Sequence, residues 1–122
     1  MKSKEEIVHD WLPRYTGLAL EDFTPYILLT NFSHYLELFA QKFNVPIQGL
    51  DKPISSVRAG GITLMNFGMG SPMAATVMDL LTAVSPKAVL FLGKCGGLKK
   101  KNALGDFILP IAAIRGEGTS SD

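Results

Sequence analysis

The sequence predicts an α/β fold, in which strands and helices alternate along the chain. Short apolar runs rich in strand-forming residues alternate with longer segments whose apolar residues recur at helical spacing. The predicted strand 62–67, helix 72–84 and strand 88–93 follow one another as in a parallel βαβ crossover. Of the 122 residues, 47% are hydrophobic and 19% are charged, which suits one compact domain with a buried core.

The N-terminal part of the chain is expected to hold one helix and one strand. Residues 3–12 have the apolar spacing of a short amphipathic helix, which Pro13 would end. Trp11 is expected to anchor this helix in the core, and residues 13–25 are typical of a loop. The apolar run 26-YILLT-30 then predicts a buried strand.

The middle of the chain predicts a second helix and weaker strands. Residues 34–43 have helical spacing, and the Ser33 hydroxyl could accept a hydrogen bond from a free N–H of the first turn. The sequence 44-NVP-46 would stop this helix. Residues 47–58 could hold one or two weak strands, followed by a glycine turn and the strand 62–67.

The remaining elements are a third helix and two apolar strands. Ser71 suits the N-cap of the helix 72–84, and Pro72 suits its first position, where no N–H is needed. The continuous apolar run 88–93 is typical of a central strand covered on both faces. Residues 107–114 predict a further strand, and since nothing in the chain follows that could cover it, we expect the chain to be half of a longer protein.

Two glycine clusters follow predicted strands and suggest a binding site. The first, 68-GMGSPMAA-75, leads into a helix, where free N–H groups and the helix dipole favour an anion. The second, 93-GKCGG-97, adds a lysine at a neighbouring strand end, where α/β sheets bind ligands. Neither matches GxGxxG or a P-loop, so the same glycines could serve only turns and close packing, and the residues alone leave both interpretations open.

Two further features of the C-terminal region bear on the site. The polar segment 115-RGEGTSSD-122 follows the last predicted strand, and its Glu117 and Thr119 are expected to line a site. Cys95 is expected to be a small buried thiol at the end of a strand, and the lysine run 99–101 a solvated loop.

Composition and charge exclude several classes of function. A formal net charge of +1 argues against a nucleic-acid-binding protein. The single cysteine allows no disulfide within the chain, and no segment resembles a signal peptide or a membrane span. We therefore expect a cytoplasmic protein with no membrane partner. No set of His and Cys residues has metal-ligand spacing, so no metal site is expected.

Three segments resemble the N-terminal half of the nucleoside phosphorylase-I family, which includes purine nucleoside phosphorylases, uridine phosphorylases and AMP nucleosidases. They are 68-GMGSPMAA-75, 89-VLFLGKCGG-97 and 105-GDFILPIAAIRGEGTS-120. The resemblance implies a three-layer αβα fold with a central mixed sheet. Residues 26–122 would form the N-terminal half of this domain, and residues 1–25 would add a helix and a loop. It also implies a homo-oligomer, a hexamer built as a trimer of dimers, without metal or organic cofactor.

Two other segments, 10-DWLPRYTG-17 and 27-ILLTNFSHY-35, resemble AMP nucleosidases in particular. Family phosphorylases hold orthophosphate with three arginines, a glycine and a serine. The matching positions here are Tyr35, Gln48 and Phe91 for the arginines, Asn31 for the glycine and Lys94 for the serine. Because bidentate arginine contacts are the strong ones for phosphate, we expect water rather than orthophosphate to be the nucleophile.

The resemblance thus implies hydrolysis of AMP to adenine and ribose 5-phosphate. Met69 would lie against the ribose, and Lys94 would line the sugar and base pocket, contact the 5′-phosphate or position the water. Arg14 and Tyr15 could reach a 5′-phosphate, across a subunit interface. The substrate-binding residues expected from these arguments are Arg14, Tyr15, Asn31, Met69, Gly70, Lys94, Cys95, Gly96, Glu117 and Thr119.

The catalytic residues stay unassigned, because the family's acid lies in the C-terminal half and neither Asp106 nor Glu117 matches its position. The chain alone is accordingly expected to be inactive. Two alternatives remain open at this point: a purine nucleoside phosphorylase with an altered phosphate site, and a non-catalytic fragment that binds a nucleotide.

Overall fold

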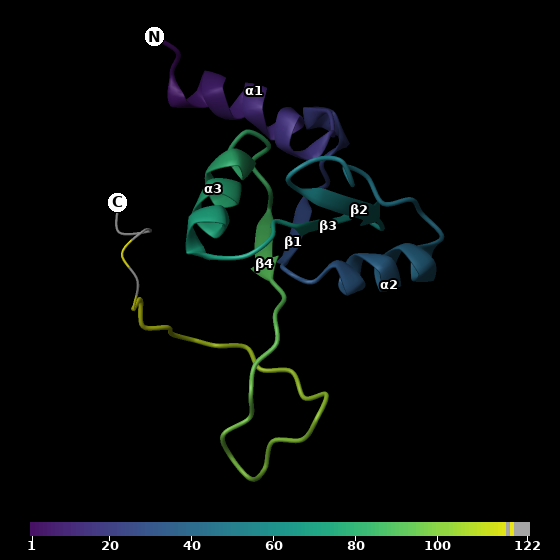
Figure 1. Cartoon of the computed structure of the whole chain (residues 1–122), viewed down its shortest axis with the longest axis vertical. Helices are drawn as coiled ribbons and strands as arrows, with labels where there is room; N and C mark the ends of the chain where they lie inside the picture. The colour runs from purple at the N-terminus through teal and green to yellow at the C-terminus, as the bar shows by residue number, and fades with distance from the viewer. Residues whose placement is uncertain (117, 119–122) are drawn as a thin grey trace.

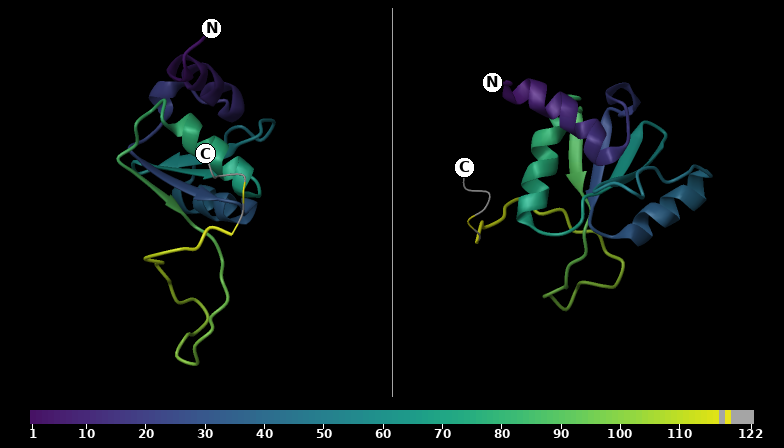
Figure 2. Two further views of the ribbon diagram at one scale, coloured as in Figure 1. Left: turned by 90° about the vertical axis from the view of Figure 1, so that its left-hand side faces the viewer. Right: turned by 45° about the horizontal axis from the view of Figure 1, so that its top comes forward.

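The computed structural model, which describes residues 1–116 and 118, has the expected α/β fold in three layers (Figure 1). Two helices cover one face of a four-stranded sheet and a third helix covers the other (Figure 2). The elements in chain order are α1 (Lys4–Thr16), the short 3₁₀ helix η1 (Leu20–Asp22), β1 (Tyr26–Thr30), α2 (Ser33–Phe43), β2 (Ser55–Ala59), β3 (Ile62–Asn66), α3 (Ser71–Leu81) and β4 (Ala88–Phe91).

The sheet is mixed, as the fold class predicted, with the strand order β2-β3-β1-β4. β1 pairs in parallel with both β3 and β4, and β2 pairs antiparallel with β3. The predicted βαβ crossover therefore exists, but β1 lies between its two strands. The carboxyl ends of β1, β3 and β4 consequently meet at one edge of the sheet.

Alternate residues of β1 face two separate cores. Ile27 and Leu29 are buried under α1 and α3, together with Met65 of β3. Leu28 points to the other face, where it packs in the cluster that contains Leu36 of α2. This alternation explains why β1 is apolar throughout.

The first helix is longer than predicted, because Pro13 lies inside α1 and does not end it. A proline at that position removes only one backbone hydrogen bond, and the helix gains by burying Leu12 and Thr16 completely. Its end is set by Gly17, which has a φ of 72° and donates its N–H to the Pro13 carbonyl at 2.8 Å. Trp11, predicted to be a core anchor, is 45% exposed.

The two predicted serine caps are wrong by one residue. Ser33 and Ser71 are the first helical residues of α2 and α3, and the N-cap positions belong to Phe32 and Gly70, neither of which makes a side-chain capping bond. The third helix also ends at Leu81, three residues earlier than predicted. Both helices therefore begin with backbone N–H groups that no side chain of the cap satisfies.

The last two predicted strands differ most from the structure. Within the described chain, β4 is an edge strand that ends at Phe91, and Leu90 and Phe91 are 52% and 55% exposed. Residues 107–114 form no strand, and the chain leaves β4 in a long loop before this segment turns back (Figure 1). An apolar run indicates that a segment tends to be buried, but it does not indicate which other element covers it. The sequence alone therefore could not establish the position of residues 88–93 and 107–114 relative to the sheet.

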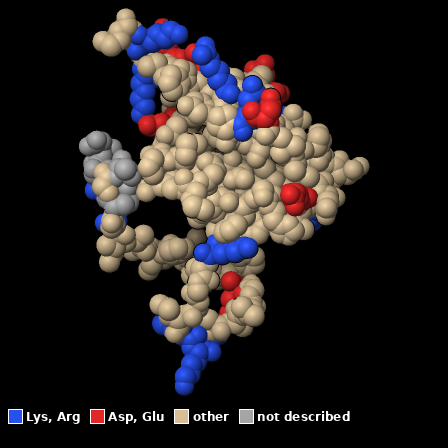
Figure 3. Space-filling model, in the orientation of Figure 1, with Lys and Arg blue, Asp and Glu red and all other residues tan. Residues whose placement is uncertain are grey.

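Charged side chains gather over α1 and at the tip of the loop after β4, with a mostly uncharged surface between them (Figure 3). Residues 99–101 lie in that loop and are exposed, as expected for a solvated lysine run. No helix in the described residues is long and apolar enough to cross a membrane.

Candidate functional site

A pocket of about 410 Å³ lies at the edge of the sheet where β1, β3 and β4 end and α3 begins. Its walls are mostly apolar, with Phe67 and Phe91 as the aromatic members. The lining residues are Leu29, Asn31, Phe67, Gly70, Ala74, Met78, Val89 and Phe91. A concave apolar site with a few polar groups is the usual form of a small-molecule pocket.

The N-terminus of α3 opens at this pocket. Gly70 has a φ of 97°, in the region that favours glycine, and its carbonyl accepts the first helical hydrogen bond from Ala74 at 3.1 Å. Upstream, the Gly68 N–H donates to Asn66 Oδ1 at 3.0 Å, which holds the loop against the end of β3. The N–H groups of Ser71 and Met73 have no acceptor within the helix, so this end can bind an anionic or strongly polar ligand group.

Asn31, directly after β1, supplies a polar side chain to the pocket wall. Its Oδ1 atom is buried and has no hydrogen-bond partner among the described residues. An unpaired buried acceptor is costly and uncommon in proteins. The position of this amide fits a donor on a ligand, such as a hydroxyl or an amino group.

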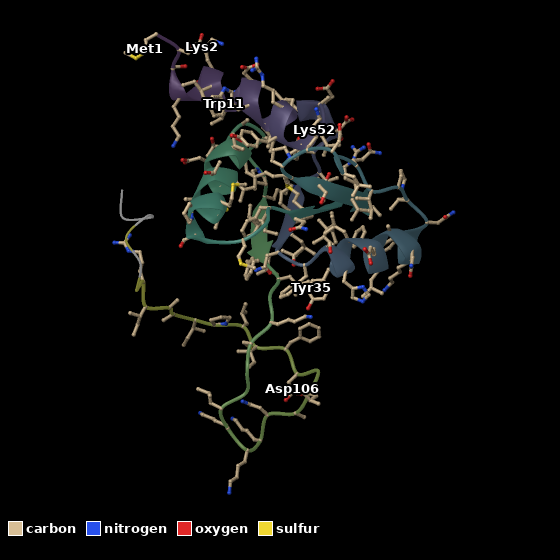
Figure 4. All side chains as sticks on the ribbon, viewed as in Figure 1. Met1, Lys2, Trp11, Tyr35, Lys52 and Asp106 are labelled. Carbon is tan, nitrogen blue, oxygen red and sulfur yellow. The ribbon has the colours of Figure 1, made fainter. Side chains whose placement is uncertain are left out.

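Lys94 lies close to the same end of β1. Its Nζ atom is 4.4 Å from the centre of the Phe32 ring and 5.6 Å from that of Tyr35. The two rings meet edge to face, with centroids 5.4 Å apart. Tyr35 lies at the start of α2, beside the chain that leaves β4 (Figure 4). Among the described residues Lys94 has no carboxylate within 4.0 Å, so its charge remains available to an anion.

The other predicted site residues of the glycine clusters lie around the pocket mouth or beyond it. Met69 precedes Gly70 and is 83% exposed. Gly96 is exposed and has open space around its Cα. Cys95 was predicted to be buried but is exposed, because the chain around it departs from the sheet instead of packing at a strand end. It lines a separate cavity of about 250 Å³ formed by the loop after β4.

Arg14 and Tyr15 are not among the pocket-lining residues. The Arg14 guanidinium is 3.1 Å from Asp10 Oδ2, and its side chain is 71% exposed. Tyr15 is partly buried against the core below α1, and its carbonyl accepts from the Ile54 N–H at 3.0 Å. Their role across a subunit interface stays a prediction. Glu117 and Thr119 lie outside the described residues.

Sequence reasoning missed most of the apolar wall and the aromatic contact of Lys94. Phe67 directly precedes the first glycine cluster, and Ala74 and Met78 follow Gly70 at helical spacing, so their position relative to the motif was a usable signal. Phe32 offered no such signal, because its partner Lys94 is far away in the sequence. The described residues hold no cluster of three or more His, Cys, Asp or Glu side chains that could bind a metal.

Comparison with known proteins gives relatives for both the sequence and the fold. The AMP nucleosidase of Escherichia coli is 28% identical over an alignment of 141 residues, which covers 85% of this chain and 29% of that protein. The guanosine phosphorylase of Halorubrum lacusprofundi is 34% identical over 59 residues, covering 48% of this chain and 24% of that protein.

A solved structure extends this likeness. The crystal structure of AMP nucleosidase from Bacteroides thetaiotaomicron is 65% identical in sequence, with a TM-score of 0.89 over 97% of this chain and 50% of that one. The chain thus spans about half the length of that structure and less than a third of the E. coli protein. A sequence profile of the phosphorylase superfamily matches residues 25–122, and the chain belongs to that superfamily.

Proposed function

We propose that the protein acts as an AMP nucleosidase, which hydrolyses AMP to adenine and ribose 5-phosphate, and that this chain supplies part of its nucleotide pocket. The observation that carries the proposal is the 65% identity to the Bacteroides AMP nucleosidase over nearly the whole chain. Residues 26–122 would be the N-terminal half of the nucleoside phosphorylase-like domain, with residues 1–25 as an added helix and loop.

The pocket supports water over orthophosphate as the nucleophile. Asn31 and Phe91, which stand where phosphorylases are expected to hold a phosphate-binding glycine and arginine, both line the pocket. No arginine occurs among the residues described as lining it. Tyr35, at a second arginine position, contacts Lys94. One lysine is a weaker ligand for orthophosphate than a set of guanidinium groups.

Each part of the pocket has a role in this proposal. The apolar wall would pack against the ribose and base and keep out bulk water other than the attacking molecule, and the Asn31 amide would accept a hydrogen bond from a hydroxyl or amino group of the nucleotide. The N-terminus of α3 and the Lys94 ammonium would attract the negatively charged part of AMP. Cleavage of the glycosidic bond also needs an acid that protonates the base, and the catalytic residues remain unassigned in this chain.

We further propose a cytoplasmic homo-oligomer of purine salvage, in which α1 reaches the site of a neighbouring subunit. Arg14 and Tyr15 would then contact the 5′-phosphate there. An Arg14→Ala variant is expected to raise the KM for AMP, and an unchanged KM would remove Arg14 from the site.

The test of the proposed reaction is release of adenine from AMP by the full-length protein, with and without orthophosphate. We expect equal rates in both conditions and ribose 5-phosphate as the sugar product, measured by chromatography. A rate that depends on orthophosphate, with ribose 1,5-bisphosphate as product, would instead favour the phosphorylase alternative. Binding of AMP without adenine release would favour a non-catalytic nucleotide-binding protein.

A further inference from the structure

Lys94 is held by a contact that its own segment does not provide. Residues 92–97, which follow β4, have no regular secondary structure, so the backbone alone leaves the direction of a long lysine side chain open. The Nζ atom nevertheless lies over the Phe32 ring, at 4.4 Å from its centre. At this distance the negative face of an aromatic ring attracts a cation.

Two features of the surrounding chain define this contact. Phe32 is fixed at the N-cap of α2, and its ring packs edge to face against Tyr35, with 5.4 Å between the ring centroids. On the opposite side, the Phe91 ring folds back over Gly93, since a Cβ atom built on Gly93 would lie only 2.6 Å from Phe91 Cε1. Gly93 thus allows Phe91 to enter the pocket wall while the next residue, Lys94, turns toward α2.

The contact leaves the lysine charge available for a ligand. A carboxylate partner would neutralise the ammonium, but the rings of Phe32 and Tyr35 hold it without doing so. Phe32 follows Asn31 directly, and Asn31 lines the pocket, so the held cation and the pocket lie at the same end of β1. A ligand that fills the pocket and extends a negative group past Asn31 would meet this ammonium.

We propose that Phe32 and Tyr35 are positioning residues that hold the Lys94 ammonium for the 5′-phosphate of a nucleotide bound in the pocket. The proposal deepens the function proposed above and rests on it for the nucleotide. Lys94 would thus contact the phosphate rather than position the water, and the two aromatic residues at the N-terminal end of α2 would fix its direction. The aromatic pair would thereby contribute to the preference for a nucleotide over a nucleoside.

The experiment measures the dissociation constants of AMP and of adenosine by calorimetry on the full-length protein, each used as its C-nucleoside analogue, whose glycosidic carbon–carbon bond the proposed reaction does not cleave. The ratio of the two constants reports the phosphate contact alone, because the two ligands differ only in that group. Lys94→Met is expected to lower the preference for AMP by roughly tenfold. Phe32→Leu keeps an apolar side chain but removes the ring, and is expected to lower the preference by about two- to fivefold.

The matched control is Phe39→Leu, on the same helix, where the ring packs against Phe43 at 4.7 Å between centroids and does not contact Lys94. This variant should leave the ratio unchanged. In a Lys94→Met background, Phe32→Leu should have no further effect on the ratio. A loss of preference that occurs only when Lys94 is present shows that Phe32 acts through Lys94, whereas an equal loss in both backgrounds would contradict this.

Equal losses of AMP and adenosine affinity in Phe32→Leu would overturn the proposal, as would an unmodified protein with no preference for AMP. The adenine-release assay is independent of this result. A protein that prefers AMP through Phe32 and Lys94 but releases no adenine would refute the proposed reaction and support the positioning role. A protein that releases adenine from AMP, but whose preference for AMP does not depend on Phe32 and Lys94, would refute the positioning role and leave the proposed reaction in place.

Discussion

Replacing Asn31 by leucine should make the protein more stable and worse at binding its ligand. The Asn31 Oδ1 atom is buried without a hydrogen-bond partner among the described residues. Burying an unpaired acceptor costs about 1–3 kcal/mol, and a leucine, whose side chain has the same heavy-atom branching, removes that cost in an apolar pocket. We therefore expect the free energy of unfolding to rise by about 1–3 kcal/mol.

The same change removes the hydrogen bond that we propose between Asn31 and the nucleotide. One such bond contributes about 0.5–1.5 kcal/mol, so the dissociation constant for AMP should rise by roughly three- to tenfold. Urea unfolding gives the change in stability, and calorimetry with the uncleavable C-nucleoside analogue of AMP gives the change in affinity. The opposite directions of the two changes are the expected signature of a residue that serves binding at the expense of stability.

Asn66 provides the matched control, because it faces Thr30 across the β1–β3 ladder and ends the neighbouring strand. Its Oδ1 atom accepts a hydrogen bond from the Gly68 N–H at 3.0 Å. Asn66→Leu should therefore lower the free energy of unfolding by about 1 kcal/mol or more. If Asn31→Leu lost as much stability as Asn66→Leu, the Asn31 amide would have a structural partner and the reasoning would fail.

Four other substitutions test how the fold is held. Gly49→Ala should cost about 2–5 kcal/mol in urea unfolding, because its φ is 70° and the new Cβ would lie 2.5 Å from a backbone carbonyl oxygen. Gly61→Ala, with a φ of 80° and open space, should cost only about 1–2 kcal/mol, and equal costs would contradict the steric argument. Ser3→Ala removes the capping box at the start of α1 and should lower stability by about 0.5–2 kcal/mol in thermal unfolding. Lys4→Ala breaks a 2.8 Å ion pair to Asp79 whose side chains are 70% and 61% exposed, so its effect should stay below about 1 kcal/mol and vanish in high salt.

The parts of the fold with local signals could be predicted from the sequence. β1, β3 and α3 each combine a run of suitable residues with a glycine or proline at the boundary, and their predicted positions agree with the structure to within a few residues. Of the residues that line the pocket, Gly70 was predicted from its glycine cluster and Asn31 from the family resemblance, and their role in binding stays a prediction. For Gly70, the informative feature of the sequence was its place between the end of a predicted strand and the start of a predicted helix.

The parts that depend on distant partners could not be predicted. The apolar sequence of β4 indicated a central strand, whereas its place in the sheet depends on which strands pair with it. Pro13 continues a helix because the burial of Leu12 and Thr16 outweighs one missing hydrogen bond. The contact of Lys94 with Phe32 joins two segments with no shared motif, and only the fold brings them together.

The position of β1 in the sheet has a consequence for how the chain is made. Both neighbours of this strand come later in the sequence, and the second of them, β4, ends about sixty residues after β1. At the usual pace of synthesis of about 5–20 residues per second, β1 leaves the ribosome roughly 3–12 s before its second neighbour exists. During that interval its apolar side chains are exposed to chaperones and to other nascent chains. The pocket at the edge of the sheet, whose walls come from β1, α3 and β4, can form only after this wait ends.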